Sequence, residues 1–318
     1  MIRECAEITS PLSECTVAIG TFDGVHIGHA KVIGSAAEKA AALGVPTRVL
    51  TFPDLPGDSI KTRARAPRIM SNALRERELI NCGADDICYF DLKNGGSEYT
   101  AERFVDEVIC GKLNAKEVFC GFNFRFGKGG SGDAETLKEL LSCKGVELTV
   151  IEPVLIGEKP VSSSRIRSMI AEGDVENAAL ALGRAYSTDF EVEHGNRIGR
   201  SIGFPTVNNR FPIGRLLPGL GVYVTRTFVN GEWYGSVTNV GTRPTVGGQE
   251  VTEETHILDF DGELYSKSVE VEYIKRLRSE KYFDSLEELR SQIKKDVLLA
   301  KEVLKEKFRN INSVKERE

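Results

Sequence analysis

From Thr16 to about Ile151 the chain alternates short apolar runs with segments of helical periodicity, and this order constrains the fold most strongly. The apolar runs predict strands at residues 16–19, 47–52, 86–90, 117–120 and 146–151. Helical segments lie between them near residues 30–43, 68–82, 99–112 and 133–143. Because strands that alternate with helices form right-handed βαβ units, we predict an α/β domain with a parallel sheet. Ligands bind such sheets at the carboxyl ends of the strands.

Beyond about Arg184 the periodicity changes to that of antiparallel strands. Four residues alternate with polar ones, as in a half-buried strand: Tyr186, Thr188, Phe190 and Val192. Further strand-like runs lie at residues 221–229, 232–240, 254–260 and 268–274, and Asn-Gly and Asp-Gly turns between some of them predict hairpins. Even spacing of short strands predicts a small antiparallel barrel. We therefore expect two domains, residues 1–184 and 185–318.

The second domain ends in one long predicted helix. Ser285 and Glu288 form a capping-box pattern at its start. Apolar residues then follow at helical spacing from Leu286 to Phe308, so we predict one amphipathic C-terminal helix.

Composition and charge limit the classes of partner. The net charge of −5 argues against a bulk nucleic-acid binder. No stretch approaches the ~18 apolar residues of a membrane span, and residues 1–10 lack the pattern of a signal peptide. The seven cysteines include no CxxC pair, which indicates free thiols in a reducing cytosol. We expect a cytoplasmic protein with no nucleic-acid or membrane partner, and the sequence leaves a homo-oligomeric state open.

The segment Gly20–His29, with the sequence GTFDGVHIGH, joins the first predicted strand to the first predicted helix. Its glycines suit a tight turn, after which His26 and His29 would lie on one face of the helix start. Free N–H groups and the positive end of the helix dipole attract a phosphate there. Imidazoles beside it can donate hydrogen bonds to charge that develops on phosphorus. A zinc pair or two surface histidines are the alternatives, although zinc usually needs further Cys or His ligands nearby.

Two further segments of the first domain could contact a ligand. Residues 121–127 follow a predicted strand and place aromatic side chains around Asn123, which suits a flat aromatic ligand or ordinary core packing. Hydroxyls and guanidiniums gather at the start of a later predicted helix, at Ser163, Ser164, Arg165 and Arg167. These residues suit a polyphosphate, and an ordinary capped helix with solvated arginines explains them equally well.

A glycine-rich segment near the start of the second domain precedes two oxygen-bearing side chains. Glycines at positions 195, 199 and 203 give a loop that can approach phosphates closely. Thr206 and Asn208 alternate onto one face of an extended segment and offer hard oxygen ligands to Mg²⁺, whereas a plain glycine-rich hairpin is the alternative. Glu254 begins a later strand and could take a proton from an attacking hydroxyl, although a single strand-end Glu is usually just solvated.

Together these segments resemble the bifunctional prokaryotic FAD synthetase family, in which a riboflavin kinase is joined to an FMN adenylyltransferase. The resemblance runs from Thr16 to about Val303 and rests on eight motifs in the same order. They are GTFDGVHIGH, GFNFRFG at 121–127, SSSRIR at 162–167, HGNRIGRSIGFPTVN at 194–208, LPGLGVY at 217–223, NVGTRPT at 239–245, ETHILDF at 254–260, and RLR at 276–278 with FDS at 283–285.

For the first domain, the resemblance implies a Rossmann-like nucleotidyltransferase fold related to that of class I aminoacyl-tRNA synthetases. His26 and His29 would stabilise the transition state as the phosphate of FMN attacks the α-phosphorus of ATP and pyrophosphate leaves. Phe52 and Phe124 would contact the flavin. The nucleotide and its phosphates would be held by Gly20, Phe22, Asp23, Gly24, Asn123, Ser163, Ser164, Arg165 and Arg167.

For the second domain, the resemblance implies a riboflavin-kinase-like barrel. Glu254 would be the base that acts on the 5′-hydroxyl of the ribityl chain. Mg²⁺, held by Thr206 and Asn208, would bridge the phosphates of ATP and neutralise charge. Arg278 would orient the flavin or the transferring phosphate. The nucleotide would also contact Gly195, Gly199, Arg200 and Pro205. Riboflavin would thus become FMN and then FAD, with ATP as co-substrate and Mg²⁺ as cofactor.

One motif departs from the family pattern. After the second predicted strand the family often shows F-x-P-H-P, whereas this chain has FPDLP at 52–56. The absent histidine and the charge of Asp54 lead to a second hypothesis, an active riboflavin kinase whose N-terminal domain has lost or altered adenylyltransferase activity. Asn123 also stands where many relatives carry Asp. A flavin- or nucleotide-binding regulator that retains the fold without the chemistry is the third hypothesis.

Overall fold

The structure is a computed structural model in which residues 1–54, 66–193, 199, 202–245 and 248–315 are described. Contacts divide the chain into two compact units, Met1–Ser163 and Ser164–Glu318. We predicted the boundary between the domains at residue 184, which is later in the chain than this division, because two helices lie between the two positions. The predicted boundary stays a prediction.

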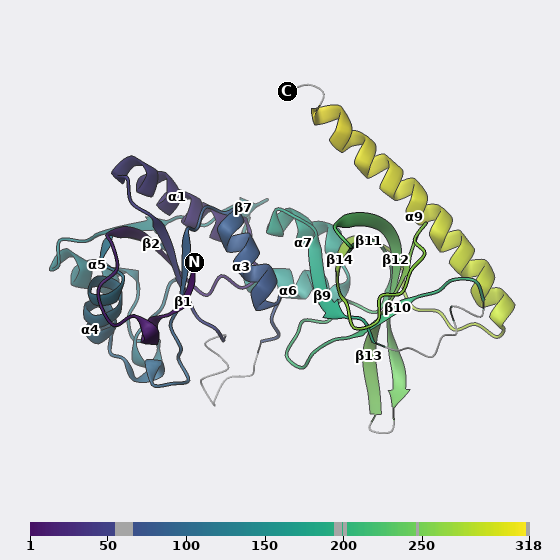
Figure 1. The fold of residues 1–318 in the computed structure, drawn as a ribbon, viewed down its shortest axis with the longest axis horizontal. Coiled ribbons are helices and arrows are strands. Elements are labelled where there is room, and N and C mark those ends of the chain that lie inside the picture. Colours follow the sequence, from purple (N-terminus) through teal and green to yellow (C-terminus); the bar gives the residue numbers. More distant parts are fainter. Residues whose placement is uncertain (55–65, 194–198, 200–201, 246–247, 316–318) are drawn as a thin grey trace. The chain divides into compact units, whose positions relative to one another are not determined.

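The first unit is built on a parallel sheet of six strands (Figure 1). Their order is β1-β4-β3-β2-β5-β6, and every neighbouring pair runs parallel. The strands are β1 (Ile2–Glu4), β2 (Cys15–Ile19), β3 (Thr47–Thr51), β4 (Asp86–Tyr89), β5 (Ala115–Gly121) and β6 (Glu147–Ile151). Five of them lie at the predicted positions. The sixth, β1, has three residues, which are too few to show a periodicity.

Helices connect these strands and cover both faces of the sheet. They are α1 (Ile27–Leu43), α3 (Asn72–Asn81), α4 (Ala101–Arg103) and α5 (Ala134–Ser142), and a π-helix (Phe104–Lys112) continues α4 directly. Val17 and Ile19 pack in the core on the side of the π-helix and α5, whereas Ala18 packs with α1 and α3. Since successive side chains of a strand point to opposite faces, β2 is buried on both sides.

Shorter elements complete the first unit. Three-residue 3₁₀ helices lie at Cys5–Glu7, Gly96–Glu98 and Lys128–Gly130, and a small hairpin joins β7 (Leu155–Ile156) to β8 (Lys159–Pro160).

The position of β2 matters more for function. After β2 the chain adds β3 and β4 on one side and β5 and β6 on the other, so β2 stands where the strand order reverses. Ligands bind α/β sheets at such a point, and Gly20–His29 follows β2 directly.

The second unit begins with α6 (Ser163–Glu172) and α7 (Val175–Leu182) and continues as an antiparallel sheet. Its strands are β9 (Tyr186–Glu191), β10 (Val207–Arg210), β11 (Gly221–Val229), β12 (Glu232–Thr245), β13 (Gly248–Ile257) and β14 (Ser268–Arg278), in the order β10-β13-β12-β11-β14-β9. The two edges meet where the Glu193 N–H donates to the Asn208 carbonyl at 2.8 Å. The predicted small antiparallel barrel is confirmed.

The terminal helix α9 (Leu286–Lys315) packs on the outside of this barrel (Figure 1). Val222 and Val224 of β11 form a core with Ala300 and Leu304 of the helix. Residues of β11 with odd numbers, such as Thr225, face the barrel interior instead, where hydroxyl groups bond to one another. This assignment of inner and outer faces applies to the neighbouring strands through their register.

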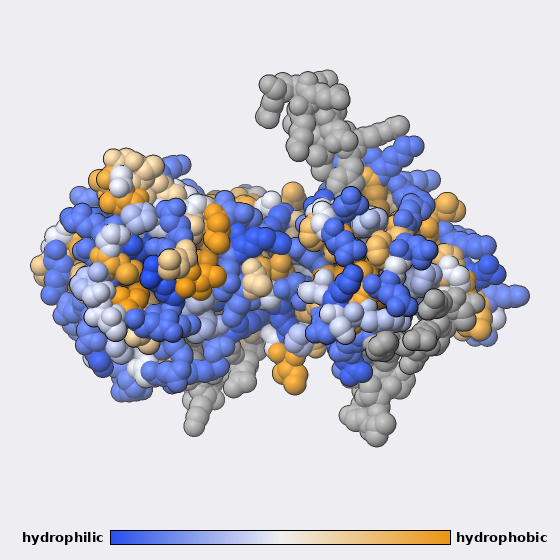
Figure 2. Space-filling model, viewed as in Figure 1, coloured by the Kyte–Doolittle hydropathy of each residue, from blue (hydrophilic) through white to orange (hydrophobic). Residues whose placement is uncertain are grey.

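The surface drawn in Figure 2 is mostly hydrophilic, with apolar residues in separate small patches. Of the helices in the described part of the chain, none combines the length and the apolar character that a membrane crossing requires. The seven cysteines are free thiols, as predicted, and four of them are buried. Burial raises the pKa of the Cys88 thiol to about 11 and that of Cys120 to about 12.

Candidate active sites

The turn between β2 and α1 has an unusual backbone. Phe22, Gly24 and Val25 have φ angles of 49°, 85° and 37°, in the left-handed region that residues other than glycine rarely adopt. Position 24 requires glycine, because a Cβ there would lie 2.9 Å from Cδ1 of Ile69. Such conformations persist only where the surroundings hold them, and they concentrate at functional sites.

Three side chains hold this turn. The Phe22 ring is 1% exposed and packs against Gly20, where a Cβ would lie 3.0 Å from the ring. The buried Asp23 carboxylate accepts the Ile69 N–H at 3.2 Å, and the Asp23 carbonyl accepts the Ser163 hydroxyl at 2.8 Å. We predicted that Phe22, Asp23 and Ser163 contact the nucleotide. In the structure all three brace the turn, and the nucleotide contact stays a prediction.

His26 and His29 lie together at the start of α1. His26 is the N-cap residue, and its Nδ1 accepts the backbone N–H of His29 at 3.3 Å. The two rings are nearly parallel, at 19°, with their centroids 3.6 Å apart. Because Nδ1 of His26 is an acceptor, the neutral ring carries its proton on Nε2 and can donate from there. The structure thus places both predicted histidines beside the N–H groups of a helix start, where an anion binds favourably.

The strands on either side of β2 supply the neighbouring residues. β3 and β5 both pair with β2, and the Gly20 N–H donates to the Leu50 carbonyl at 3.2 Å. Residues that follow β3 and β5 therefore lie next to the turn. Phe52 follows β3, and its carbonyl accepts a hydrogen bond from Arg75 at 2.9 Å. Asn123 follows β5 and is exposed, as a ligand-binding amide at this edge would be.

The rings of Phe52 and Phe124, which we predicted to contact a flavin, are buried in the core, and this contact stays a prediction. Phe124 stacks on Phe126 with 5.7 Å between the ring centroids, and Phe52 packs in the same core. Phe122 is instead 48% exposed at the end of β5. The sequence could not separate Phe122 from Phe124, because both are aromatic residues at alternate positions of one segment. The only available signal was that Phe122 follows the strand directly.

Asp54, the residue that departs from the family pattern, is paired with two cations. Its Oδ1 lies 2.6 Å from Nη2 of Arg68, and its Oδ2 contacts the Lys93 ammonium. Arg68 also donates to the Pro53 carbonyl at 2.9 Å, and the next residue, Ile69, donates to the Asp23 carboxylate. The negative charge of Asp54 is thus matched, and it holds Arg68 beside the segment that braces the turn.

The remaining predicted phosphate ligands of the first domain stand at the start of α6. Ser164 is exposed, Arg165 and Arg167 are half-buried, and Ile166 between them is buried. These three polar residues belong to the second compact unit. Their contact with phosphates at Gly20–His29 therefore stays a prediction.

The second candidate site lies on the outer face of the barrel. Glu254 of β13 is directly opposite Asn208 of β10 on one side and Asn239 of β12 on the other. Asn239 in turn is opposite Val222, whose side chain packs toward α9 and so marks the outer face. Directly opposite residues share a face. A half-buried carboxylate therefore lies between two amide-bearing residues on the same face of the sheet, an arrangement that the sequence pattern alone could not predict.

Thr206 and Asn208 lie together beside this carboxylate. Nδ2 of Asn208 donates to the Thr206 carbonyl at 3.2 Å and lies 3.5 Å from its hydroxyl. The Pro205 carbonyl, one residue earlier, is 2.8 Å from Nδ1 of His256 on β13. These contacts fix the segment that enters β10. Hydroxyl and amide oxygens are ligands that Mg²⁺ accepts, so the donor set fits this ion. Among the described residues, no three His, Cys, Asp or Glu side chains form a metal-binding group.

The glycine-rich segment is described only in part. Gly195 and Arg200, which we predicted as nucleotide contacts, lie outside the described residues. Gly199 is described, and its carbonyl accepts the Phe204 N–H at 2.7 Å. A Cβ on Gly199 would lie 2.3 Å from the Phe204 carbonyl oxygen and 3.4 Å from the Thr206 hydroxyl. Only glycine permits this close approach next to the candidate magnesium ligands.

Arg278, which we predicted to orient the flavin or a phosphate, binds the terminal helix in the structure. Its Nε and Nη2 donate to the carboxylate of Asp296 at 3.1 and 2.9 Å, and its Nη1 donates to the Ser279 carbonyl. Asp296 is 2% exposed and also accepts a hydrogen bond from Gln292. The guanidinium thus anchors α9 to the barrel, and direct contact with a substrate stays a prediction.

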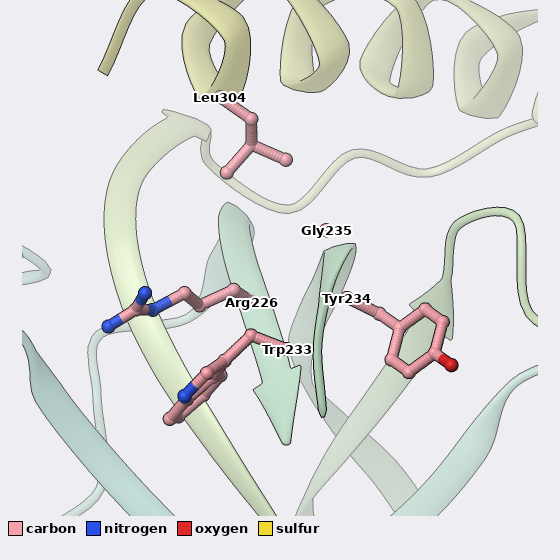
Figure 3. Close-up of a pocket in the computed structure, with 5 residues that line it drawn as sticks. All are labelled: Arg226, Trp233, Tyr234, Gly235 and Leu304. Carbon is pink, nitrogen blue, oxygen red and sulfur yellow. The ribbon is translucent and has the colours of Figure 1, made fainter. Parts of the chain in front are cut away.

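A cavity of about 260 Å³ opens between α9 and the barrel (Figure 3). The guanidinium of Arg226 stacks over the Trp233 ring at 4.3 Å and also pairs with Glu272. The residues that line the cavity are Arg226, Trp233, Tyr234, Gly235 and Leu304. None of the residues that we predicted to bind substrate lines this cavity.

Comparisons with known proteins cover almost the whole chain. The family model of FAD synthetase matches residues 8–165, and that of riboflavin kinase matches residues 182–304. The bifunctional riboflavin kinase/FMN adenylyltransferase of Bacillus subtilis is 34% identical over 289 residues, which cover 89% of this chain and 90% of that protein. The protein of the same name from Escherichia coli K12 is 32% identical, covering 92% and 94%.

A solved structure also matches the fold. The crystal structure of a protein described as a macrolide-efflux protein from Streptococcus pneumoniae has a TM-score of 0.85 and 31% identity, and the match covers 93% of this chain and 96% of that chain. The fold, the two family models and the full-length relatives agree in the order of the two units. The chain belongs to the family of bifunctional riboflavin kinases/FMN adenylyltransferases.

Proposed function

We propose that this chain phosphorylates riboflavin to FMN with its second unit and adenylylates FMN to FAD with its first unit, with one ATP used in each reaction. Family membership supports both activities. The observation that carries the proposal is the register of β10 and β13, which sets Glu254 opposite Asn208 and close to Thr206. A cytoplasmic location is part of the proposal and is supported by the free cysteines.

In the kinase reaction, Glu254 accepts the proton of the 5′-hydroxyl of riboflavin while the oxygen attacks the γ-phosphorus of ATP. The bond between this phosphorus and the bridging oxygen breaks, so FMN and ADP are the products. Thr206 and Asn208 would hold Mg²⁺, which when bound neutralises charge on the phosphates. Gly199 and Pro205 border the nucleotide.

In the adenylyl transfer, a phosphate oxygen of FMN attacks the α-phosphorus of ATP, and pyrophosphate leaves without a covalent enzyme intermediate. His26, His29 and the first N–H groups of α1 donate hydrogen bonds to the oxygens on which charge grows. Gly20 and Gly24 let the backbone approach the phosphates closely. Asn123 borders the same edge of the sheet and contacts the nucleotide or the flavin.

The test incubates the purified protein with riboflavin, ATP and Mg²⁺ and separates the flavins by chromatography over time. We expect FMN first and FAD later, with one ADP formed for each FMN made, including FMN that has since become FAD, and one pyrophosphate formed for each FAD. If neither FMN nor FAD forms, the proposal is overturned. FMN that accumulates without FAD would favour the second hypothesis, a kinase whose first unit has lost adenylyl transfer. Because Arg68 and Lys93 match the charge of Asp54, we expect FAD to form.

A further inference from the structure

A carboxyl group lies in the interior of the barrel, where neither proposed reaction uses it. Glu253 is 0% exposed. It accepts hydrogen bonds from the Thr188 hydroxyl at 2.9 Å, from Nδ2 of Asn209 at 3.0 Å and from the Tyr273 hydroxyl. Burial raises the pKa of Glu253, and the three donors oppose that rise. A buried carboxylate stabilises a fold less well than packed apolar side chains do, so its presence calls for another role.

The three donors come from strands that are far apart in the sheet order. Thr188 belongs to β9 and Asn209 to β10, and these are the two edge strands. Tyr273 belongs to β14, the neighbour of β9. The Glu253 side chain, which comes from β13, therefore ties both edges together through the interior. On the barrel wall the same edges meet at the Glu193–Asn208 bridge.

This tie lies directly behind the candidate kinase site. Asn209 is opposite Glu253 on the inner face, and Asn208 is opposite Glu254 on the outer face, as consecutive pairs of the same two strands. β10 has only four residues, and β13 is its neighbour in the sheet order. A slip of one residue would turn Asn208 inward and Asn209 outward. The interior contact from Asn209 to Glu253 opposes that slip.

We propose that Glu253 is a positioning residue for riboflavin phosphorylation, because its interior carboxyl group closes the barrel and keeps Asn208 and Thr206 in place beside Glu254. The inference rests on the proposed kinase activity. Glu253 itself touches no substrate. It acts through β10, which carries the candidate magnesium ligand Asn208 and begins directly after the other candidate, Thr206.

The first pair of variants separates the hydrogen bonds from the charge. Glu253→Val removes all three acceptor contacts, whereas Glu253→Gln keeps the shape and most of the contacts. Oδ1 of Asn209 has no hydrogen-bond partner among the described residues. A half-turn of the Asn209 amide therefore lets this oxygen accept from the amide of a glutamine at position 253. We expect Glu253→Gln to behave nearly as the unsubstituted protein does.

The control is Thr227→Val, which removes another buried hydrogen bond of the barrel interior, the one to Ser236 at 2.8 Å. Thr227 is opposite Tyr234 and Val271, on rungs that the candidate site does not use. A substitution here lowers barrel stability without reaching β10. The rate of FMN-to-FAD conversion in the same chain serves as a second control, since we propose that the first unit performs it.

Four quantities are measured for each variant: kcat and KM for ATP in riboflavin phosphorylation, the Mg²⁺ concentration that gives half-maximal rate, and hydrogen exchange of the amides of residues 207–210. In Glu253→Val we expect the KM for ATP and the Mg²⁺ requirement to rise roughly tenfold, as substitutions behind metal ligands do, with faster exchange in β10. Thr188→Val, which removes one donor, should shift all three in the same direction by less, and it replaces Glu253→Val if that variant does not fold.

Unchanged KM, Mg²⁺ requirement and β10 exchange in Glu253→Val would overturn the inference. So would equal effects of Glu253→Val and Thr227→Val, because these would reflect barrel stability alone. If the unsubstituted protein makes no FMN, the proposed kinase activity fails, whereas the exchange of β10 still shows whether Glu253 holds that strand.

Discussion

Asn208 and Glu254 face each other across β10 and β13 on the outer surface of the barrel. Thr206, which precedes β10, contacts the Asn208 amide, so the candidate base and both candidate magnesium ligands form one group. A base must lie within hydrogen-bond reach of the hydroxyl that it activates, and the phosphates must lie beside that hydroxyl. The pairing of two short strand segments brings together the side chains that we propose for these two tasks.

Replacing Glu254 with Gln should abolish riboflavin phosphorylation and leave FMN adenylylation intact. Glutamine keeps the size of the side chain but cannot take the proton, and a general base contributes about 10²–10⁴-fold to the rate. The measurement is the rate of FMN formation from riboflavin, alongside the rate of FAD formation from supplied FMN. Retention of kinase activity would remove Glu254 from the mechanism.

Glu250→Gln is the matched control for this substitution. Glu250 lies on the same strand with the same parity and is partly exposed, and it pairs with Arg210 at 3.5 Å. Surface ion pairs of this kind contribute little. Both reaction rates should therefore stay close to those of the unsubstituted protein. A large loss of kinase activity in Glu250→Gln would show that the strand tolerates no change of charge.

His26→Asn should abolish FAD formation and leave riboflavin phosphorylation intact. Asparagine is a good N-cap, so α1 should keep its start, and only the imidazole donor is lost. Removal of one donor to developing charge costs about 10²–10³-fold in rate. Steady-state rates of pyrophosphate release from FMN and ATP test this, with circular dichroism as the check on helix content.

His29→Ala is the companion variant and should give the same division between the two activities. His29 stacks on His26 and also contacts the Phe22 ring edge-on. If either histidine variant lost both activities with its fold intact, the assignment of one reaction to each unit would be wrong.

Much of the fold could be predicted because periodicity records burial. β2 to β5 read as apolar runs since both faces of a central parallel strand are covered, and the barrel strands alternate because only one side faces the core. β1 and the π-helix left no such signal. β1 is a three-residue edge strand, and the residues of the π-helix follow α4 with ordinary helical periodicity.

The candidate site was predictable by motif and less so by contact. The histidine pair and the Thr206–Asn208 spacing come from neighbours in the chain, so the sequence contains them. The role of an aromatic ring cannot be predicted in this way, because Phe52 and Phe124 follow strands and give the same sequence pattern whether they face a ligand or the core. Glu253 was also missed, although its parity with Thr255 in an alternating strand was a usable sign of an inward carboxyl group.

Asp54→Ala should lower FAD formation and leave the kinase rate unchanged. Asp54 holds Arg68, and the next residue, Ile69, donates to the Asp23 carboxylate that braces the turn. Loss of this anchor should loosen the turn that carries the histidines. Rates of FAD formation from supplied FMN measure the effect. An increase in FAD formation would mean that the charge of Asp54 inhibits adenylyl transfer.

Lys93→Met offers a graded control for Asp54→Ala. It removes one of the two cations that contact Asp54 and leaves the contact to Arg68 in place. A partly exposed pair contributes roughly 0–1 kcal/mol, so we expect a smaller loss of FAD formation than in Asp54→Ala. A larger loss would place Lys93, rather than Arg68, at the centre of this contact.

Arg278→Met should destabilise the second unit more than Asp296→Leu does. Without Arg278 the carboxylate of Asp296 stays buried with only the Gln292 amide as a neutral donor, at a cost of roughly 2–3 kcal/mol. Without Asp296 the guanidinium can turn to water, since its side chain is 22% exposed. Trp233, the single tryptophan, reports urea unfolding of this unit by fluorescence. If Arg278 only anchors α9, the KM for riboflavin changes in neither variant. A rise in this KM in Arg278→Met alone would instead support the predicted contact with the flavin.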